Sequence, residues 1–64
     1  MNNKIKEVRR QKRMTQSQLA EKANVCRPYL SAIERGRQQV ISNIVMEKIS
    51  IALDTPVSEI FFTR

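Results

Sequence analysis

Apolar residues recur along the chain every three or four positions, which is the spacing of amphipathic α-helices and not of strands. In the first such stretch Ile5 and Val8 form the inward pair, and the stem of Lys12 can extend their stripe. We expect five helices in all, over residues 3–13, as a pair within residues 15–36, and over residues 42–53 and 57–61. The pattern therefore predicts an all-α fold.

The stretch from Thr15 to Gly36 has the sharpest boundary signals. Thr15 and Gln18 form a T-x-x-Q capping box, in which each side chain bonds a backbone N–H of the other residue. Asn24 tolerates the left-handed conformation that ends many helices, and Gly36 is the natural stop of the second helix. Pro28 fits only a first helical turn, where its missing N–H would have no partner. Two short helices joined by a tight turn form a helix-turn-helix.

The inward face of this helix pair leaves a distinct outer face. The inward residues are Leu19, Ala20, Ala23, Val25 in the turn, Leu30 and Ile33. What remains on the outer side of the first two turns of the second helix is Arg27, Pro28, Ser31 and Ala32, which we call the reading face. In a helix-turn-helix this part of the second helix lies in the DNA major groove and reads base edges. The spacing therefore predicts base contacts from these four residues.

The side chains of the reading face differ in what they can recognise. Arg27 alone can grip guanine O6 and N7 with two hydrogen bonds, worth ~1–3 kcal/mol of discrimination. Pro28 and Ala32 offer apolar contact, for instance to a thymine methyl, whereas Ser31 can bond either way. Tyr29 at the edge either reaches a phosphate through its hydroxyl or packs its ring on the helix with the hydroxyl in water. The sequence leaves both interpretations of Tyr29 open.

Several of these residues also fit a family signature, Q-x-x-L-A … G-V-S-x-x-x-I-S-x-x-E-x-G. The matching residues are Gln16, Leu19-Ala20, Val25, Leu30-Ser31 and Ile33-Glu34-Arg35-Gly36. From Ile5 to Phe61 the chain resembles the phage-repressor and Cro-like helix-turn-helix family, also called the xenobiotic-response-element type. The resemblance implies a compact five-helix lambda-repressor-like DNA-binding domain. The departures are Asn24 for the usual Gly, Cys26 for the usual N-capping Ser or Thr, and Pro28 in the reading turn.

The resemblance also implies roles for polar residues outside the reading face. In relatives an Arg at the place of Arg9 pairs with the Glu at the place of Glu34, which implies a structural ion pair. Gln16 opens the first helix of the pair, where free N–H groups and the helix dipole favour the phosphate that the family holds there. The loop after the second helix lies along the sugar-phosphate backbone in the family, so we expect phosphate contacts from Arg37 and Gln38.

The formal net charge of +6 favours a polyanionic partner, either nucleic acid or an anionic membrane surface. Half of the twelve cations lie in the first stretch, namely Lys4, Lys6, Arg9, Arg10, Lys12 and Arg13. Arg10 and Arg13 adjoin the start of the next helix, so we assign them to phosphate and leave Lys4 and Lys6 to solvent. Two apolar residues on this stretch are too few to insert into a bilayer, which argues against membrane binding.

Composition narrows the classes of chemistry. One cysteine and no histidine exclude an internal disulfide and a Cys/His zinc site, and Cys26 has no base partner for catalysis. We therefore expect no enzyme, no cofactor and no small-molecule effector pocket. Cys26 is either a small half-buried residue or a thiol made reactive by a helix N-terminus. Without a membrane-length apolar run or a signal core, the expected location is cytoplasmic, at the nucleoid.

The fourth expected helix, with Ser42 as its N-cap, carries two apolar stripes. Its core stripe is Val45, Met46, Ile49, Ala52 and Leu53. Ile44 and Ile51 form a second stripe, and apolar surface beyond the needs of the core suggests an interface, although single exposed isoleucines need no explanation. The residues assigned to a dimer interface are Ile41, Ile44, Ile51 and Phe62. Thr55 is the expected cap of the last helix, whose Val57, Ile60 and Phe61 close the core.

Two functions from different classes follow. The first is a homodimeric, sequence-specific regulator of transcription that binds double-stranded DNA, acts as a repressor, and reads a near-palindromic operator with half-sites about 34 Å apart. The second is a protein-interaction module, antitoxin-like or an adaptor, that uses the apolar surface of the last two helices and binds DNA secondarily. Arg27 and the basic loops favour the first, because a pure adaptor has no need for them.

Overall fold

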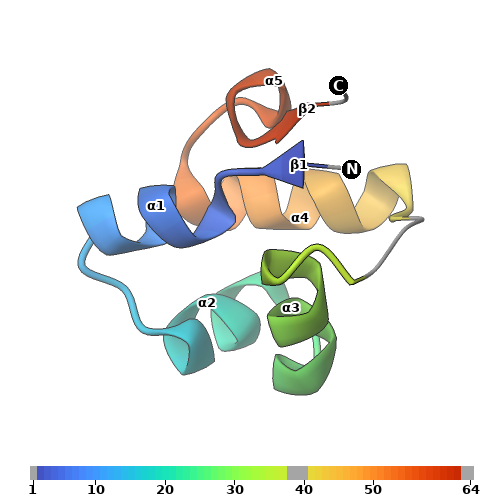
Figure 1. Ribbon diagram of the computed structural model, residues 1–64. Coiled ribbons are helices and arrows are strands. Elements are labelled where there is room, and N and C mark those ends of the chain that lie inside the picture. Colours follow the sequence, from blue (N-terminus) through green and yellow to red (C-terminus); the bar gives the residue numbers. More distant parts are fainter. Residues whose placement is uncertain (1, 38–40, 63–64) are drawn as a thin grey trace.

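The computed structural model describes residues 2–37 and 41–62, which form five helices and one pair of short strands. The helices are α1 (Ile5–Gln11), α2 (Gln16–Ala23), α3 (Arg27–Glu34), α4 (Asn43–Leu53) and α5 (Val57–Ile60), and the strands are β1 (Asn2–Asn3) and β2 (Phe61–Phe62). In Figure 1, α4 crosses the molecule, α2 and α3 lie below it, and α5 lies above it with the strands. The expected five helices are confirmed.

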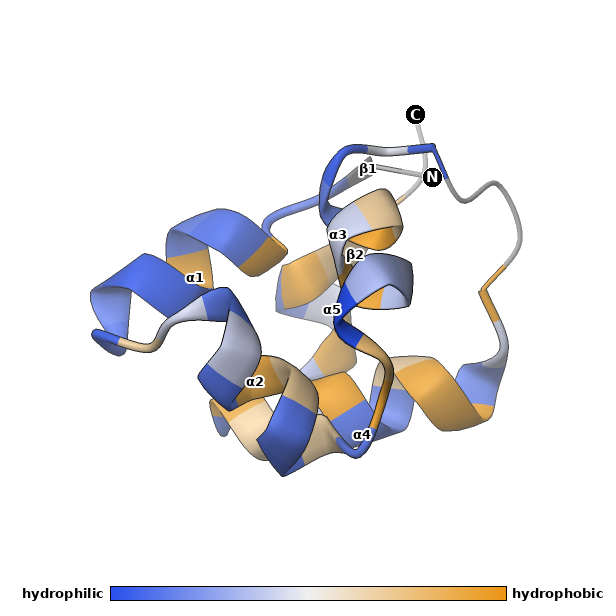
Figure 2. Cartoon of the chain, turned by 90° about the horizontal axis from the view of Figure 1, so that it is seen from below, coloured by the Kyte–Doolittle hydropathy of each residue, from blue (hydrophilic) through white to orange (hydrophobic). Residues whose placement is uncertain are grey.

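A single core is shared by all five helices and lies around α4. Its buried side chains are Ile5, Val8, Leu19, Ala20, Ala23, Leu30, Ile33, Ile41, Ile49, Ala52, Leu53, Ile60 and Phe61. Val45 and Met46 of the expected core stripe are only half-buried, packed against this cluster. In Figure 2 the ribbon of α4 is hydrophobic over much of its length, whereas that of α1 is mostly hydrophilic. α4 is therefore the element against which the others bury their apolar sides.

The boundaries of α2 and α3 are those that the local signals predict. Thr15 Oγ1 accepts a hydrogen bond from the Gln18 N–H at 3.1 Å, and the Thr15 N–H donates to Gln18 Oε1 at 2.8 Å. Asn24 is left-handed at φ 57° and Gly36 at φ 74°, and Pro28 lies in the first turn of α3. These features fix the turn between the helices and the end of α3.

The first helix is shorter than the expected 3–13. It ends at Gln11, and Arg13 adopts φ 56°, a left-handed conformation that cannot continue an α-helix. It starts only at Ile5, because Asn3 belongs to β1 and its Oδ1 accepts a hydrogen bond from the Ile5 N–H at 3.2 Å. The apolar pattern predicts the position of the helix correctly, but it does not predict the turn that follows the helix.

The C-terminal end differs more from the expectation. The last helix stops at Ile60 instead of Phe61, which is extended at φ −113° and belongs to β2. β2 pairs antiparallel with β1, with Asn3 opposite Phe61, and the Lys4 N–H donates to the Ile60 carbonyl at 2.8 Å. The segment before α1 and the segment after α5 are thus joined by backbone bonds that no periodicity could reveal, since each strand has two residues.

The caps of the last two helices contrast. Ser42 caps α4 as expected, because its Oγ accepts from the Val45 N–H at 3.2 Å. Thr55 as the cap of α5 is wrong: Pro56 occupies the N-cap position, and the Thr55 hydroxyl donates backwards to the Leu53 carbonyl at 2.9 Å. Hydroxyl residues can bond preceding carbonyls as well as following N–H groups, and here the end of α4 takes the bond.

Candidate nucleic-acid interface

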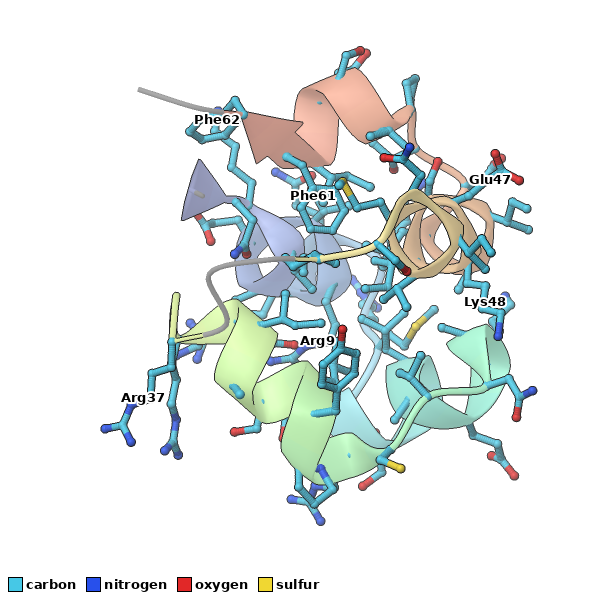
Figure 3. The ribbon with its side chains drawn as sticks, turned by 90° about the vertical axis from the view of Figure 1, so that its right-hand side faces the viewer. Arg9, Arg37, Glu47, Lys48, Phe61 and Phe62 are labelled. Atoms are coloured by element: carbon cyan, nitrogen blue, oxygen red, sulfur yellow. The ribbon has the colours of Figure 1, made fainter. Side chains whose placement is uncertain are left out.

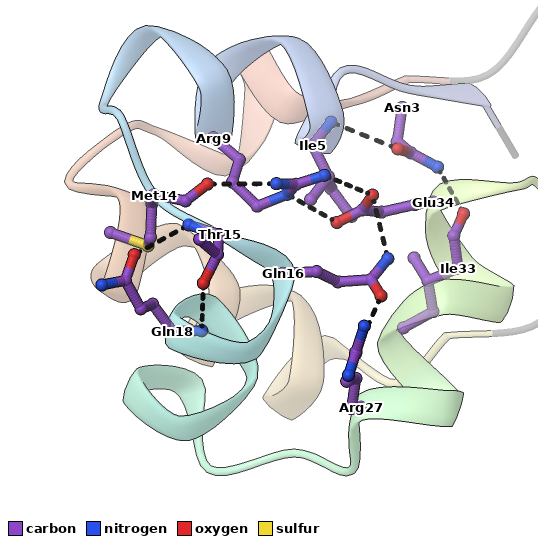
Figure 4. Close-up of polar contacts among 10 residues, drawn as sticks. All are labelled: Asn3, Ile5, Arg9, Met14, Thr15, Gln16, Gln18, Arg27, Ile33 and Glu34. Carbon is purple, nitrogen blue, oxygen red and sulfur yellow. Dashed lines mark hydrogen bonds and ion pairs between the residues drawn. The ribbon is translucent and has the colours of Figure 1, made fainter.

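A partly buried ion pair fastens α1 to the end of α3. Arg9 Nε donates to Glu34 Oε2 at 3.0 Å and Nη2 to Glu34 Oε1 at 3.1 Å, and Nη1 donates to the Met14 carbonyl at 3.0 Å (Figure 4). The side chains of Arg9 and Glu34 are 12% and 4% exposed. A two-bond contact between guanidinium and carboxylate fixes distance and angle together. The pair that the family resemblance implies is therefore present, and it sets the position of α1 relative to α3.

Gln16 extends this contact to the start of α3. Its Nε2 donates to Glu34 Oε1 at 3.3 Å, and its Oε1 accepts from Arg27 Nε at 3.4 Å (Figure 4). We call the series of bonds from the Met14 carbonyl through Arg9, Glu34 and Gln16 to Arg27 the polar relay. A side-chain amide has two N–H donors and two lone pairs, so one of each remains on Gln16. Gln16 can thus still donate to an anion at the first turn of α2.

The reading face is open to solvent, as the helix pair predicts. Arg27 and Pro28 are exposed at the first two positions of α3, and Ser31 and Ala32 are half-exposed one turn later. Tyr29 is half-buried and packs against the core. Of the two interpretations of Tyr29, this arrangement favours the ring packed on the protein. Assignment of these residues to base or phosphate contacts stays a prediction.

An open hollow lies between α1, α2 and α3, next to the reading face. It is lined by Lys6, Arg9, Gln16, Ser31, Glu34 and Arg35. Three of these residues are cations and one is an anion, so the lining carries a formal charge of +2. Such a concave, positive surface attracts a phosphate more strongly than a single exposed lysine does. The hollow therefore adds two cations, Lys6 and Arg35, to the candidate interface.

The sequence analysis left Lys6 to solvent and gave Arg35 no contact. The signal that could have found Lys6 is its position three residues before Arg9, because residues three apart share a helix face. If Arg9 points toward α3, Lys6 must lie on the same side of α1. Arg35 is the C-cap residue of α3, and its position follows from where that helix ends.

The other residues expected to contact phosphates do not line this hollow. Arg10 lies in the last turn of α1 and Arg13 in the loop after it, both exposed. Arg37 is exposed beyond α3, on the side of the molecule opposite Glu47 and Lys48 of α4 (Figure 3). Gln38 lies outside the described residues. Cys26, as the N-cap of α3, is exposed and forms no side-chain cap bond, so the half-buried interpretation of this residue is wrong.

The residues assigned to a dimer interface do not form one surface. Ile41 is 6% exposed and belongs to the core, which corrects its assignment: the residue before α4 closes the core instead of facing out. Ile44 and Ile51 are 69% and 72% exposed on α4. Phe62 is half-buried in β2, with Lys4 Nζ 6.0 Å from its ring centre, and lies across the molecule from Glu47 (Figure 3).

No helix within residues 2–37 and 41–62 is both long and apolar enough to cross a membrane. Over residues 5–60 the chain matches a family model described as helix-turn-helix.

Among curated proteins, it is 46% identical over 54 residues to the HTH-type transcriptional regulator SinR of Bacillus subtilis (strain 168), covering 84% of this chain and 49% of SinR. It is also 46% identical over 57 residues to the immunity repressor protein of Bacillus phage phi105, covering 89% of this chain and 39% of that protein. A crystal structure of SinR in complex with DNA superimposes with a TM-score of 0.80 at 46% identity, covering 84% of this chain and 86% of that one. The chain spans half the length of these curated relatives or less.

Proposed function

Because the chain belongs to the helix-turn-helix family, we propose that it is a sequence-specific regulator of transcription that binds double-stranded DNA. The observation that carries the proposal is the polar relay, which links Arg27 at the exposed start of α3 to Gln16 in the first turn of α2. A guanidinium that lies beside an anion site and stays open to solvent can contact a base while a phosphate sets the register of the helix. SinR in complex with DNA has a closely similar fold, which supports the proposal.

In the proposed complex the two kinds of contact divide between neighbouring surfaces. The reading face enters the major groove, with Arg27 on a guanine and Ser31, Pro28 and Ala32 on the base edges beside it. The remaining N–H of Gln16 and the positive hollow hold phosphates of one strand. Arg10, Arg13 and Arg37 complete the proposed phosphate contacts from exposed positions. Gln38 and the hydroxyl of Tyr29 are proposed for the same role from the sequence alone.

The regulator acts as a homodimer on a near-palindromic operator. One helix with two turns of exposed side chains reads only a few base pairs, which gives too little specificity within a genome. Two copies on one side of the duplex double the contacts and match a two-fold symmetric site. Repression by occupying a promoter requires nothing beyond this domain, and the phage phi105 relative is a repressor by name.

Selection from a pool of random duplexes at moderate salt, followed by sequencing of the bound fraction, tests the proposal. We expect a two-fold symmetric site with half-sites about one helical turn, roughly 34 Å, apart. Enrichment of one half-site alone would contradict the dimer and retain base reading. Binding without any enriched sequence would contradict sequence-specific regulation. It would favour the second candidate, a protein-interaction module, for which the exposed Ile44 and Ile51 are the supporting observation.

A further inference from the structure

One apolar stripe remains uncovered on α4. Ile44 and Ile51, 69% and 72% exposed, are the two large hydrophobic side chains left in solvent within residues 2–37 and 41–62. They are seven residues apart, close to two full helical turns, so they lie on one line along α4. Glu47 and Lys48 lie between them along the axis, one on each side of that line. We call these four residues the α4 surface.

The α4 surface faces away from the candidate DNA interface. In Figure 3 Glu47 and Lys48 project from the right-hand side of the molecule, whereas Arg37 lies at the left and the helix α3 runs from there to below the centre. Ile44 and Ile51, which lie between Glu47 and Lys48 around the helix, share their direction. Contact through the α4 surface therefore leaves the reading face free.

We infer that the α4 surface binds a second copy of this chain, with the two α4 helices parallel. Apolar residues seven apart meet their own counterparts in a parallel two-fold pair, so each isoleucine packs on the partner's equivalent. In the same pair, Glu47 lies opposite the partner's Lys48 on one edge of the seam, and the reciprocal contact forms on the other edge. The surface is thus complementary to itself in both hydrophobicity and charge.

The charges select this arrangement over the reverse one. In an antiparallel pair Glu47 lies beside the partner's Glu47, and Lys48 lies beside the partner's Lys48. Like charges placed together oppose association, whereas opposite charges specify register and orientation. The adjacent Glu47 and Lys48 therefore favour the parallel pair of identical chains. Four side chains per copy form a contact below the size of a stable interface, so we expect a weak dimer with Kd on the order of 100 µM.

The parallel pair has a consequence that rests on the proposed function. A two-fold axis along α4 rotates the partner by half a turn, so the two reading faces point in opposite directions. Two such faces cannot both contact one side of a single straight duplex. If each face binds DNA, the pair holds two duplex segments together, and the two copies on one operator meet through a different contact.

Sedimentation equilibrium of the 64-residue chain without DNA tests the pairing. Glu47→Lys and Lys48→Glu should each raise Kd about tenfold or more, because each replaces two attractive contacts by repulsive ones. The double exchange, Glu47→Lys with Lys48→Glu, should return Kd to within about threefold of the original. The matched controls are Glu21→Lys and Lys22→Glu, an exposed adjacent pair on α2, which should leave Kd unchanged.

Three results would overturn the inference. The first is a chain that stays monomeric up to about 1 mM, ten times the expected Kd. The second is a dimer that either single exchange leaves intact, and the third is a dimer that the double exchange fails to restore. Circular dichroism of each variant verifies that the helices are present, so a loss of pairing cannot be mistaken for unfolding.

A second measurement separates pairing from DNA binding. An immobilised duplex carrying the original protein should capture a second, labelled duplex at protein concentrations near Kd. Glu47→Lys should abolish this capture and Glu21→Lys should preserve it, since both add the same charge. If no variant binds any duplex, the proposed function fails and sedimentation still decides the pairing. A chain that pairs and binds one duplex but captures no second one would contradict the opposed reading faces.

Discussion

The two ends of the polar relay differ in burial and in bond length. At the inner end, Arg9 and Glu34 are 12% and 4% exposed and share two bonds of 3.0 and 3.1 Å. At the outer end, Arg27 is exposed and bonds Gln16 at 3.4 Å. The inner contact consists of two short bonds between side chains that are largely shielded from solvent, whereas the outer contact is one longer bond at an exposed residue. Charge-assisted contacts of the first kind are strong, whereas exposed ones contribute little to stability.

Because of this difference, the Arg9–Glu34 bonds stabilise the fold, whereas the end of the relay at Arg27 is available for recognition. At the inner end both charges have lost most of their contact with water, so each depends largely on the other for its polar contacts. At the outer end Arg27 keeps its water and can exchange a weak bond for a base edge with little loss. The Arg9–Glu34 pair is held rigidly, whereas Arg27 is held loosely. Arg27 is therefore positioned near the DNA and its guanidinium still remains available for a base contact.

The largest effect on stability is expected from removing the anion at the inner end. Glu34→Ala should lower the free energy of unfolding by about 3–5 kcal/mol, because the Arg9 guanidinium is left buried without its partner. Urea unfolding followed by circular dichroism measures the change. The control is Glu21→Ala, an exposed carboxylate on α2, for which we expect a change within about 0.5 kcal/mol. Equal effects of the two substitutions would show that burial does not distinguish the inner end.

Features that depend on near neighbours in the chain could be predicted from the sequence. The capping box of Thr15 and Gln18, the left-handed Asn24 and the stop at Gly36 each involve bonds within a few residues. Propensity and side-chain chemistry decide such bonds before the chain packs. The reading face follows from them, since the inward residues of α3 determine which side remains outside.

Features that depend on distant residues could not be predicted in this way. Ile41 appears surplus beside an already apolar α4, and only the packed structure shows that it fills the core. The Asn3 side chain donates to the Ile33 carbonyl at 2.9 Å, which ties β1 to the end of α3 across 30 residues. The place of Lys6 in the hollow depends likewise on how α1 lies against α3. The periodicity of apolar residues predicts which face of a helix is buried, but it does not predict which distant residues come into contact.

The next largest effect is expected at the outer end. Arg27→Ala should reduce discrimination between the selected site and random duplex by ~1–3 kcal/mol, because the two bonds to guanine are lost. Non-specific binding should be mostly retained, and the free energy of unfolding should change by less than about 0.5 kcal/mol. Fluorescence anisotropy with both duplexes measures the first two quantities. Arg10→Ala, the loss of an exposed cation on α1, serves as the control and should weaken both duplexes alike. An equal loss on both duplexes for Arg27→Ala would contradict its assignment to base reading.

The smallest effect is expected at Gln16, which links the Arg9–Glu34 pair to Arg27. Gln16→Ala removes an uncharged phosphate contact, so affinity for every duplex should fall together, by about 0.5–1.5 kcal/mol. The slope of log K against log salt should not change, since no cation is lost. Gln11→Ala, an exposed amide at the end of α1, is the control and should leave affinity unchanged. Anisotropy across a salt series separates the outcomes. A selective loss on the specific site would instead mean that the 3.4 Å bond from Arg27 Nε to Gln16 holds the reader in place. The outer end would then be part of the anchor, and the contrast between a fixed inner end and a free outer end would be wrong.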